Sequence, residues 1–288
     1  MDFTWNLVAD FQQMWQFQFM QHAFEAGTLV SIMAGIVGYF VILRRTAFAA
    51  HALSHVGFAG AAGAVLLNSQ PIFGLLVFTN GGGIAMALLG RRASERDTQI
   101  GIVLAFMLGL GVLFISLYKG YATQAYSILF GEILGISLLY VELTAAATIF
   151  ILALVSVLYR PLLFSSLDQD VAEAKGLPVL GLNILFMILL AVAASFAVSV
   201  VGILLIFSLM VTPAAAAEHL AKTPRNAMAI SIVISLAATW MGLFVGFYEP
   251  YPVSFFITAF VFAAYILVRL LHHRLEIPTL SPRSLWKQ

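Results

Sequence analysis

Long apolar stretches separated by short polar connections dominate the sequence. A helix needs about 20 mostly apolar residues to cross the hydrocarbon core of a membrane, which is about 30 Å thick. Nine stretches come near this length, at 24–43, 48–67, 71–90, 100–118, 137–159, 179–198, 201–217, 227–247 and 253–271. The second is interrupted by His51, Ser54 and His55, and the seventh is short and carries Pro213. The pattern predicts an all-α fold, a polytopic membrane helical bundle of about eight to ten spans in which residues 24–271 form one transmembrane domain.

Composition agrees with a chain that lies mostly in lipid. Apolar residues make up 62% of the 288 residues and charged residues 9%, whereas a soluble domain carries about 25% charged residues. The formal net charge of +1 gives no broad basic field of the kind that binds nucleic acid. The chain has no cysteine, which excludes disulfides and thiolate metal sites.

Basic residues predict the orientation, because cytoplasmic loops of membrane proteins are enriched in Lys and Arg. If nine spans alternate and the loop around residues 91–96 is cytoplasmic, only Lys119 of the fourteen Lys and Arg residues falls outside. The N-terminus is then outside, and residues 272–288 form a cytoplasmic tail. We expect a multi-pass protein of a bacterial inner or plasma membrane.

Residues 1–23 are predicted to form an interfacial N-terminal segment. The apolar residues of this segment recur at helical spacing, at Val8, Phe11, Trp15 and Phe19. Aromatic side chains suit the boundary between lipid and water. The alternative is a tail without regular structure.

The connection at 160–178 predicts a short helix with both ends marked. Ser166 and Gln169 have the spacing of a capping box, and Asp168 and Asp170 favour the positive end of a helix. The C-terminal markers are Lys175 in the last turn, Gly176 for a left-handed residue and Pro178 as a stop. Such a helix on the cytoplasmic face could dock a soluble partner, or it could merely link two spans.

His51 and His55 are four residues apart, so they share one face of a helix. Two imidazoles at this spacing can bind one metal ion. If Arg45 marks the inner interface, His51 lies ~9 Å and His55 ~15 Å along the helix, the latter near the middle of the membrane. Ionisable groups at that depth usually face a cavity. The alternative is a pair of neutral imidazoles that form hydrogen bonds between helices.

Two further features could contribute to a cation path. Glu132 lies in the outer connection after the fourth span, where a carboxylate could attract a cation; it could equally be an exposed or capping residue. The dipeptide Thr212-Pro213 could break the seventh helix and free carbonyl groups to line a path, or it could only kink the helix.

Three stretches together carry a resemblance to a known family. The first is Leu43-Arg44-Arg45-Thr46-Ala47-Phe48, followed by His51-Ala52-Leu53-Ser54-His55 and a run of small residues at 57–63. The second is the connection at 166–177, and the third runs from Val200-Val201-Gly202-Ile203-Leu204-Leu205 to Val211-Thr212-Pro213-Ala214-Ala215. In this order and spacing they resemble the metal-uptake ABC permeases, the zinc, manganese and iron importer family often called ABC-3. The similarity covers most of residues 24–271.

The resemblance implies a permease subunit that moves a divalent transition metal into the cytoplasm. Two permease copies would form the pore, a cytoplasmic ATP-binding subunit would power it, and an extracytoplasmic metal-binding protein would deliver the ion. The helix at 166–176 would then dock on the ATPase, with Asp168, Asp170, Glu173 and Lys175 as its charged residues. The metal is cargo, and no permanently bound cofactor is expected. Consistently, the sequence has no Gly-x-x-x-x-Gly-Lys-Ser/Thr phosphate loop, so the chain is not expected to be an enzyme by itself.

One position departs from the family pattern. This chain has His51 where the family usually shows Asp, in the pattern Asp-Ala-Leu-Ser-His. The resemblance favours metal contact for both His51 and His55. A related alternative is a permease for a metal chelate such as a siderophore. A carrier driven by an ion gradient would need acidic residues inside its spans, where the pattern offers only Glu142.

Overall fold

The computed structural model describes residues 7–89, 96–118, 131 and 133–275, and all regular structure in these residues is helical. Nine of the helices in this part of the chain are long and apolar enough to cross a membrane. The all-α fold and the predicted number of spans are therefore confirmed. The helices are α1 (Leu7–Trp15), α2 (Gln18–Leu43), α3 (Ala47–Leu66), α4 (Pro71–Leu89), α5 (Arg96–Leu117), the 3₁₀ turn η1 (Ile133–Gly135), α7 (Leu138–Leu167), α8 (Gln169–Ala174), α9 (Val179–Val201), α10 (Ile203–Leu220), α11 (Pro224–Tyr248) and α12 (Val253–Leu275).

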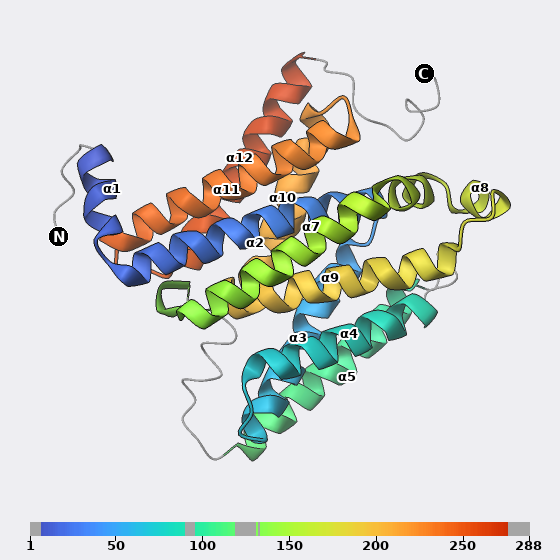
Figure 1. Cartoon of the computed structure of the whole chain (residues 1–288), viewed down its shortest axis with the longest axis horizontal. Coiled ribbons are helices and arrows are strands. Elements are labelled where there is room, and N and C mark those ends of the chain that lie inside the picture. Colours follow the sequence, from blue (N-terminus) through green and yellow to red (C-terminus); the bar gives the residue numbers. More distant parts are fainter. Residues whose placement is uncertain (1–6, 90–95, 119–130, 132, 276–288) are drawn as a thin grey trace.

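The long helices form three groups around a buried centre (Figure 1). Helices α2, α7 and α9 cross the middle of the molecule, α10–α12 pack on one side, and α3–α5 pack on the other. In the apolar segments of α2 and α9, 72% of the residues are buried, and 78% are buried in α3. In the apolar segment of α5 only 11% are buried, so this helix lies at the edge of the bundle, where it packs on α3, while α2, α3 and α9 form the core.

Small residues allow two of these helix pairs to pack backbone against backbone. A Cβ atom on Gly60 of α3 would overlap the carbonyl group of Gly74 in α4, and one on Gly74 would overlap Gly60 in return. Gly38 of α2 packs in the same way against the carbonyl of Met210 in α10. Lipid is as apolar as the side chains, so close van der Waals packing of this kind is what holds membrane helices together.

A tight turn joins α2 to α3 and places the two histidines. Arg45 adopts a left-handed conformation with φ of 55°. Its N–H donates to the carbonyl of Ile42, and the N–H of Thr46 donates to the carbonyl of Val41, which is the Schellman pattern of helix termination. Helix α3 begins immediately afterwards at Ala47, so both histidines lie in its first nine residues.

Helices α9 and α10 are joined by the single residue Gly202. Its φ of 86° and ψ of 165° belong to a region that is open almost only to glycine. From there α10 runs to Leu220 without a break, with Pro213 inside it. The predicted break at Thr212-Pro213 is therefore not observed. Proline removes one backbone donor, but the remaining backbone groups must still pair within the membrane, which keeps the helix intact.

Helix α7 is longer than the sequence pattern predicts and leads directly into α8. It continues through Pro161 to Leu167, eight residues beyond the predicted end at 159. The predicted capping box does not form, because the Ser166 hydroxyl donates to the carbonyl of Leu162 instead. The cap is Asp168, whose Oδ1 accepts a hydrogen bond of 3.0 Å from the N–H of Val171.

The C-terminal end of α8 forms as predicted. Gly176 is left-handed, with φ of 80°, and the N–H groups of Gly176 and Leu177 donate to the carbonyls of Glu173 and Ala172. This is a second Schellman turn.

The N-terminal helix α1 packs on the protein. The ring of Phe11 stacks on that of Trp15 at 5.6 Å between centroids and on that of Trp240 in α11 at 6.2 Å. Met14 is fully buried. Helix α2 begins at Gln18, so residues 18–23 are its first turns.

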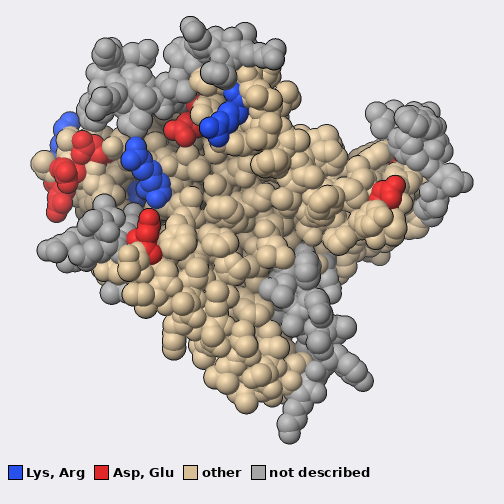
Figure 2. Space-filling view, turned by 180° about the vertical axis from the view of Figure 1, so that it is seen from behind, with Lys and Arg blue, Asp and Glu red and all other residues tan. Residues whose placement is uncertain are grey.

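Charged side chains concentrate at one end of the molecule. On the face seen in Figure 2, the Lys and Arg side chains gather toward the end at which α8 lies in Figure 1. This is the distribution that the positive-inside rule requires of the cytoplasmic end.

Candidate functional site

The imidazoles of His51 and His55 lie next to each other on α3. Their ring centroids are 4.6 Å apart, with an angle of 78° between the ring planes. The ring of His51 also contacts that of Phe207 in α10, at 5.0 Å between centroids. The helical spacing of four residues therefore brings the two side chains together as predicted, and α10 covers one side of the pair.

Both histidines occupy the one accessible stripe in this part of α3. Between residues 49 and 64, every residue except His51 and His55 is buried. Phe48, one turn before His51 on the same face, is 40% exposed. Neither imidazole forms a hydrogen bond with any residue that the structure describes. The described residues therefore do not support the alternative in which the two imidazoles form hydrogen bonds between helices.

The pair places two imidazoles, which are candidate nitrogen ligands for a metal ion, side by side. Across the described residues, no group of three or more His, Cys, Asp and Glu side chains could hold a metal ion. Zinc is usually bound by four ligands, three or four of them from protein. Within one chain, the described residues at this position therefore offer fewer ligands than a structural zinc site has.

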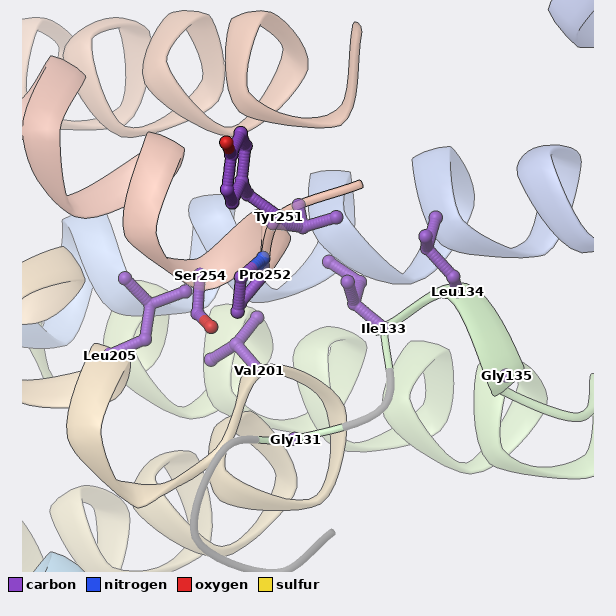
Figure 3. A pocket seen from close by; sticks show the side chains of 10 residues that line it. Gly131, Ile133, Leu134, Gly135, Val201, Leu205, Tyr251, Pro252 and Ser254 are labelled. Carbon is purple, nitrogen blue, oxygen red and sulfur yellow. The ribbon is translucent and has the colours of Figure 1, made fainter. Parts of the chain in front are cut away.

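The outer end of the bundle holds a largely apolar cavity of about 270 Å³ (Figure 3). Gly131 and the η1 turn form one wall, and the start of α10 and the turn before α12 form the others. The polar groups in its lining side chains are the hydroxyls of Tyr251 and Ser254. The carboxylate proposed to attract a cation at this end, Glu132, lies outside the described residues.

The four residues expected to contact an ATPase lie in α8 and at its ends. Asp168 is half-buried and caps the helix, so part of its role is structural. Asp170 and Glu173 are exposed. Lys175 is also exposed, and its ammonium group lies 5.5 Å from the centre of the Phe164 ring. Helix α8 thus presents two free carboxylates on a short, firmly capped element.

Arg44, at the end of α2, joins the last turns of α7 to α9. Its Nε donates to Ser166 Oγ at 2.7 Å, its Nη2 to Ser165 Oγ at 2.9 Å, and its Nη1 to Asn183 Oδ1 at 2.8 Å. The guanidinium also lies 4.6 Å from the ring centre of Phe186. One side chain at the C-cap of α2 therefore joins the end of α7 to the start of α9. The sequence does not reveal this role of Arg44, because two adjacent arginines between apolar stretches indicate only a membrane boundary.

Acidic residues are more frequent in the spanning helices than the sequence pattern suggests. The expectation that Glu142 is the only one is wrong, because Glu25, Asp97 and Glu218 also lie within the bounds of these helices. Glu25 already lies within the predicted stretch 24–43, whereas Asp97 and Glu218 lie just beyond the predicted stretches, in helices that are longer than predicted: α10 ends at Leu220, and the pattern ends at 217. Glu218 lies in the last turn of α10, with His219 and Arg45 as its charged neighbours.

Comparison with known proteins extends over nearly the whole chain. Residues 16–272 match the ABC 3 transport family. The chain is 32% identical over 237 residues to the manganese import system permease protein ScaB of Streptococcus gordonii, covering 82% of this chain and 85% of that protein. It is 28% identical over 235 residues to the high-affinity zinc uptake system membrane protein ZnuB of Haemophilus influenzae, covering 81% and 90%.

A solved structure has a similar fold. The structure of PsaBC from Streptococcus pneumoniae in complex with Fab superposes with a TM-score of 0.82 and 29% sequence identity. The match covers 91% of this chain and 95% of that one.

Proposed function

We propose, from the premise that this chain belongs to the ABC 3 transport family, that it is the permease subunit of an importer for a divalent transition-metal ion. It is a multi-pass protein of the cell membrane. A separate ATP-binding subunit powers the transport, and an extracytoplasmic metal-binding protein delivers the ion.

The observation that carries this proposal is the histidine pair of α3. A buried apolar helix has two adjacent imidazoles on its single accessible stripe, with ring centroids 4.6 Å apart. Polar and ionisable residues within a membrane are costly and usually face a path for an ion or substrate. Imidazole nitrogen is a good ligand for transition metals.

Two copies of the chain form the path in this proposal. One copy offers two imidazoles in the described residues, and a second copy related by two-fold symmetry offers two more, since such an interface uses the same patch twice. Four nitrogen ligands would suffice for a transition metal without a residue from any other protein.

Zinc is the cargo that the imidazole pair favours over manganese. The family pattern has Asp at the position of His51, and carboxylate oxygen suits manganese whereas imidazole suits zinc. Replacing a carboxylate by a neutral imidazole also removes a negative charge from the path, which weakens the attraction for every divalent cation. We therefore expect a shift in selectivity together with weaker absolute binding.

Coupling to the ATPase runs through α8 and Arg44 in this proposal. The exposed carboxylates of Asp170 and Glu173 contact the ATP-binding subunit, and Asp168 keeps the helix folded. Arg44 then transmits a movement of α8 to the turn that begins α3, because its guanidinium holds both the end of α7 and the start of α9.

Purification of the complex tests the proposal. The chain should copurify with a nucleotide-binding subunit, and native mass measurement should find two copies of each. Uptake of zinc into proteoliposomes should require ATP. Transport by a complex with a single permease copy, or uptake driven by an ion gradient without the ATPase, would contradict it.

A further inference from the structure

A second histidine pair lies at the opposite end of α10 from the Gly202 turn. His219 is in the last turn of α10, and His272 is near the end of α12. Their ring centroids are 5.2 Å apart, and the ring planes differ by 37°. The two residues are 53 positions apart in sequence, so only the packing of α10 against α12 brings them together.

The ring nitrogens of this pair lack partners among the described residues. Nδ1 of His219 and Nδ1 of His272 are both buried, and neither forms a hydrogen bond. Buried polar atoms in proteins nearly always have a partner, and each exception requires an explanation. A metal ion held between the two rings would supply a partner to both nitrogens.

The spacing of the rings fits one ion with tetrahedral geometry. A Zn–N bond of about 2.0–2.1 Å places the ion about 3.2 Å from the centre of an imidazole ring. Two rings bound to that ion at a tetrahedral angle then have centroids about 5.2 Å apart. The observed separation is 5.2 Å.

The surroundings contain charges of both signs. Glu218, the residue before His219, provides a carboxylate that interacts with it. Among the positive groups, Arg45 is a neighbour of Glu218, and Arg269 of α12 donates to the hydroxyl of Tyr265 at 3.4 Å. Both histidines are half-buried, so part of each imidazole is accessible although its Nδ1 is buried.

This pair is separate from the one on α3. His219 follows Phe207, the residue in contact with His51, by twelve positions on α10, which is ~18 Å along the helix. It lies at the end of α10 that the positive-inside rule places in the cytoplasm. The two pairs are therefore at different depths along the same helix.

We propose that His219 and His272 form a second transition-metal site, at the cytoplasmic end of the molecule. The ligand is a zinc-type ion bound by two imidazole nitrogens and by water, and it bridges α10 to α12. Two protein ligands make an exchangeable site and not a structural one. The site stands on its own geometry, whether or not His51 and His55 contact the cargo.

Direct zinc binding tests this site independently of transport. The full-length permease, purified with its ATPase subunit, would carry His51→Ala and His55→Ala so that the α3 pair is absent. In this background we expect the thermal unfolding temperature to rise with added zinc. We expect Co²⁺ to give the intense visible absorption of a tetrahedral complex. Adding either His219→Ala or His272→Ala should weaken zinc binding by tenfold or more, while His22→Ala, which removes a half-buried imidazole from α2, should not.

A gain-of-binding variant keeps the test decisive if the alanine variants do not fold. The protein has no cysteine, so His219→Cys with His272→Cys introduces the only two thiols into the permease. This variant should bind Cd²⁺ with the ultraviolet absorption of thiolate coordination, and either single cysteine variant should bind it more weakly. Equal zinc binding with and without the His219 and His272 imidazoles, or equal Cd²⁺ binding by the single and double cysteine variants, would overturn the proposal.

Discussion

At the scale of single residues, we propose that His51 sets the preference between zinc and manganese. The imidazole of His51 contacts the imidazole of His55 and the ring of Phe207. His51 also occupies the position at which the family pattern has an aspartate. Zinc and manganese differ mainly in their preference for nitrogen or oxygen ligands. A change of one ligand atom should therefore alter selectivity more than it alters the fold.

His51→Asp should shift the ratio of zinc to manganese uptake toward manganese. We expect a shift of roughly tenfold, which corresponds to about 1.4 kcal/mol. The measurement is uptake by the reconstituted complex, with one fixed binding protein that accepts both metals. His22→Asp is the matched control on α2 and should leave the ratio unchanged. An unchanged ratio in the His51 variant would show that this side chain does not select the ion.

Arg44 is the residue whose loss should most damage the packing near α8. Arg44→Ala would leave Ser165, Ser166 and Asn183 without their charged partner, at a cost of about 2–4 kcal/mol. The adjacent Arg45→Gly should stabilise the protein by about 1 kcal/mol, because Arg45 is exposed in a left-handed conformation. Thermal unfolding in detergent would compare the two. Equal effects would mean that the Arg44 contacts contribute nothing.

At the scale of elements, α8 has a capping residue and two exposed carboxylates, which we propose contact the ATPase, within a few positions. Asp168 accepts the capping hydrogen bond, so changing it would destabilise the helix by about 1 kcal/mol as well as alter its charge. The two exposed carboxylates, Asp170 and Glu173, can be changed without touching the cap.

Asp170→Lys together with Glu173→Lys should weaken the association with the ATPase and leave membrane insertion intact. Single surface ion pairs contribute only about 0–1 kcal/mol, which is why both residues must be reversed. The readout is the amount of ATPase that copurifies. Glu142→Lys, an exposed reversal at the start of α7, is the control and should have no effect. If the double variant copurified with as much ATPase as the unaltered chain, the charges of α8 would not contribute to docking.

The single-residue link at Gly202 makes a second element-level prediction. Gly202→Ala places a Cβ atom in a backbone region that disfavours it, at a cost of about 1–3 kcal/mol. Gly81→Ala, inside α4 with no atom within 4 Å of the new Cβ, should stabilise the protein by up to about 1 kcal/mol. Unfolding temperatures of the two variants should move in opposite directions. Loss of stability in both would mean that glycine itself, and not the backbone angle, is what matters.

Elements with strong local signals could be predicted from the sequence. Apolar length identified all nine spanning helices in the described chain, and Gly176 identified the end of α8. The end of α7 is not marked by the apolar pattern, because that pattern ends at 159 while the helix continues through Arg160 and Pro161 to Leu167. The predicted cap at Ser166 is wrong, because its hydroxyl donates to the Leu162 carbonyl one turn earlier and accepts from Arg44, which is distant in sequence.

At the scale of the whole molecule, the sites arise where distant segments meet. The spacing of His51 and His55 could be read from one helix, but the cover that Phe207 provides could not. The pairing of His219 with His272 depends on the packing of two helices separated by α11. The local sequence pattern therefore predicts the helices and the shared face of His51 and His55. The Phe207 contact and the His219–His272 pair depend on packing between helices, which the pattern does not predict.

Uptake of zinc by the reconstituted complex with His51→Ala and His55→Ala tests the central claim most directly. We predict that ATP-dependent zinc uptake falls at least about tenfold, an effect of about 1.4 kcal/mol or more, while the ATPase still copurifies. His22→Ala, which removes an imidazole elsewhere on the protein, should transport like the unaltered chain. Uptake at the unaltered rate in the double variant would contradict the account, because the metal would then cross without either imidazole.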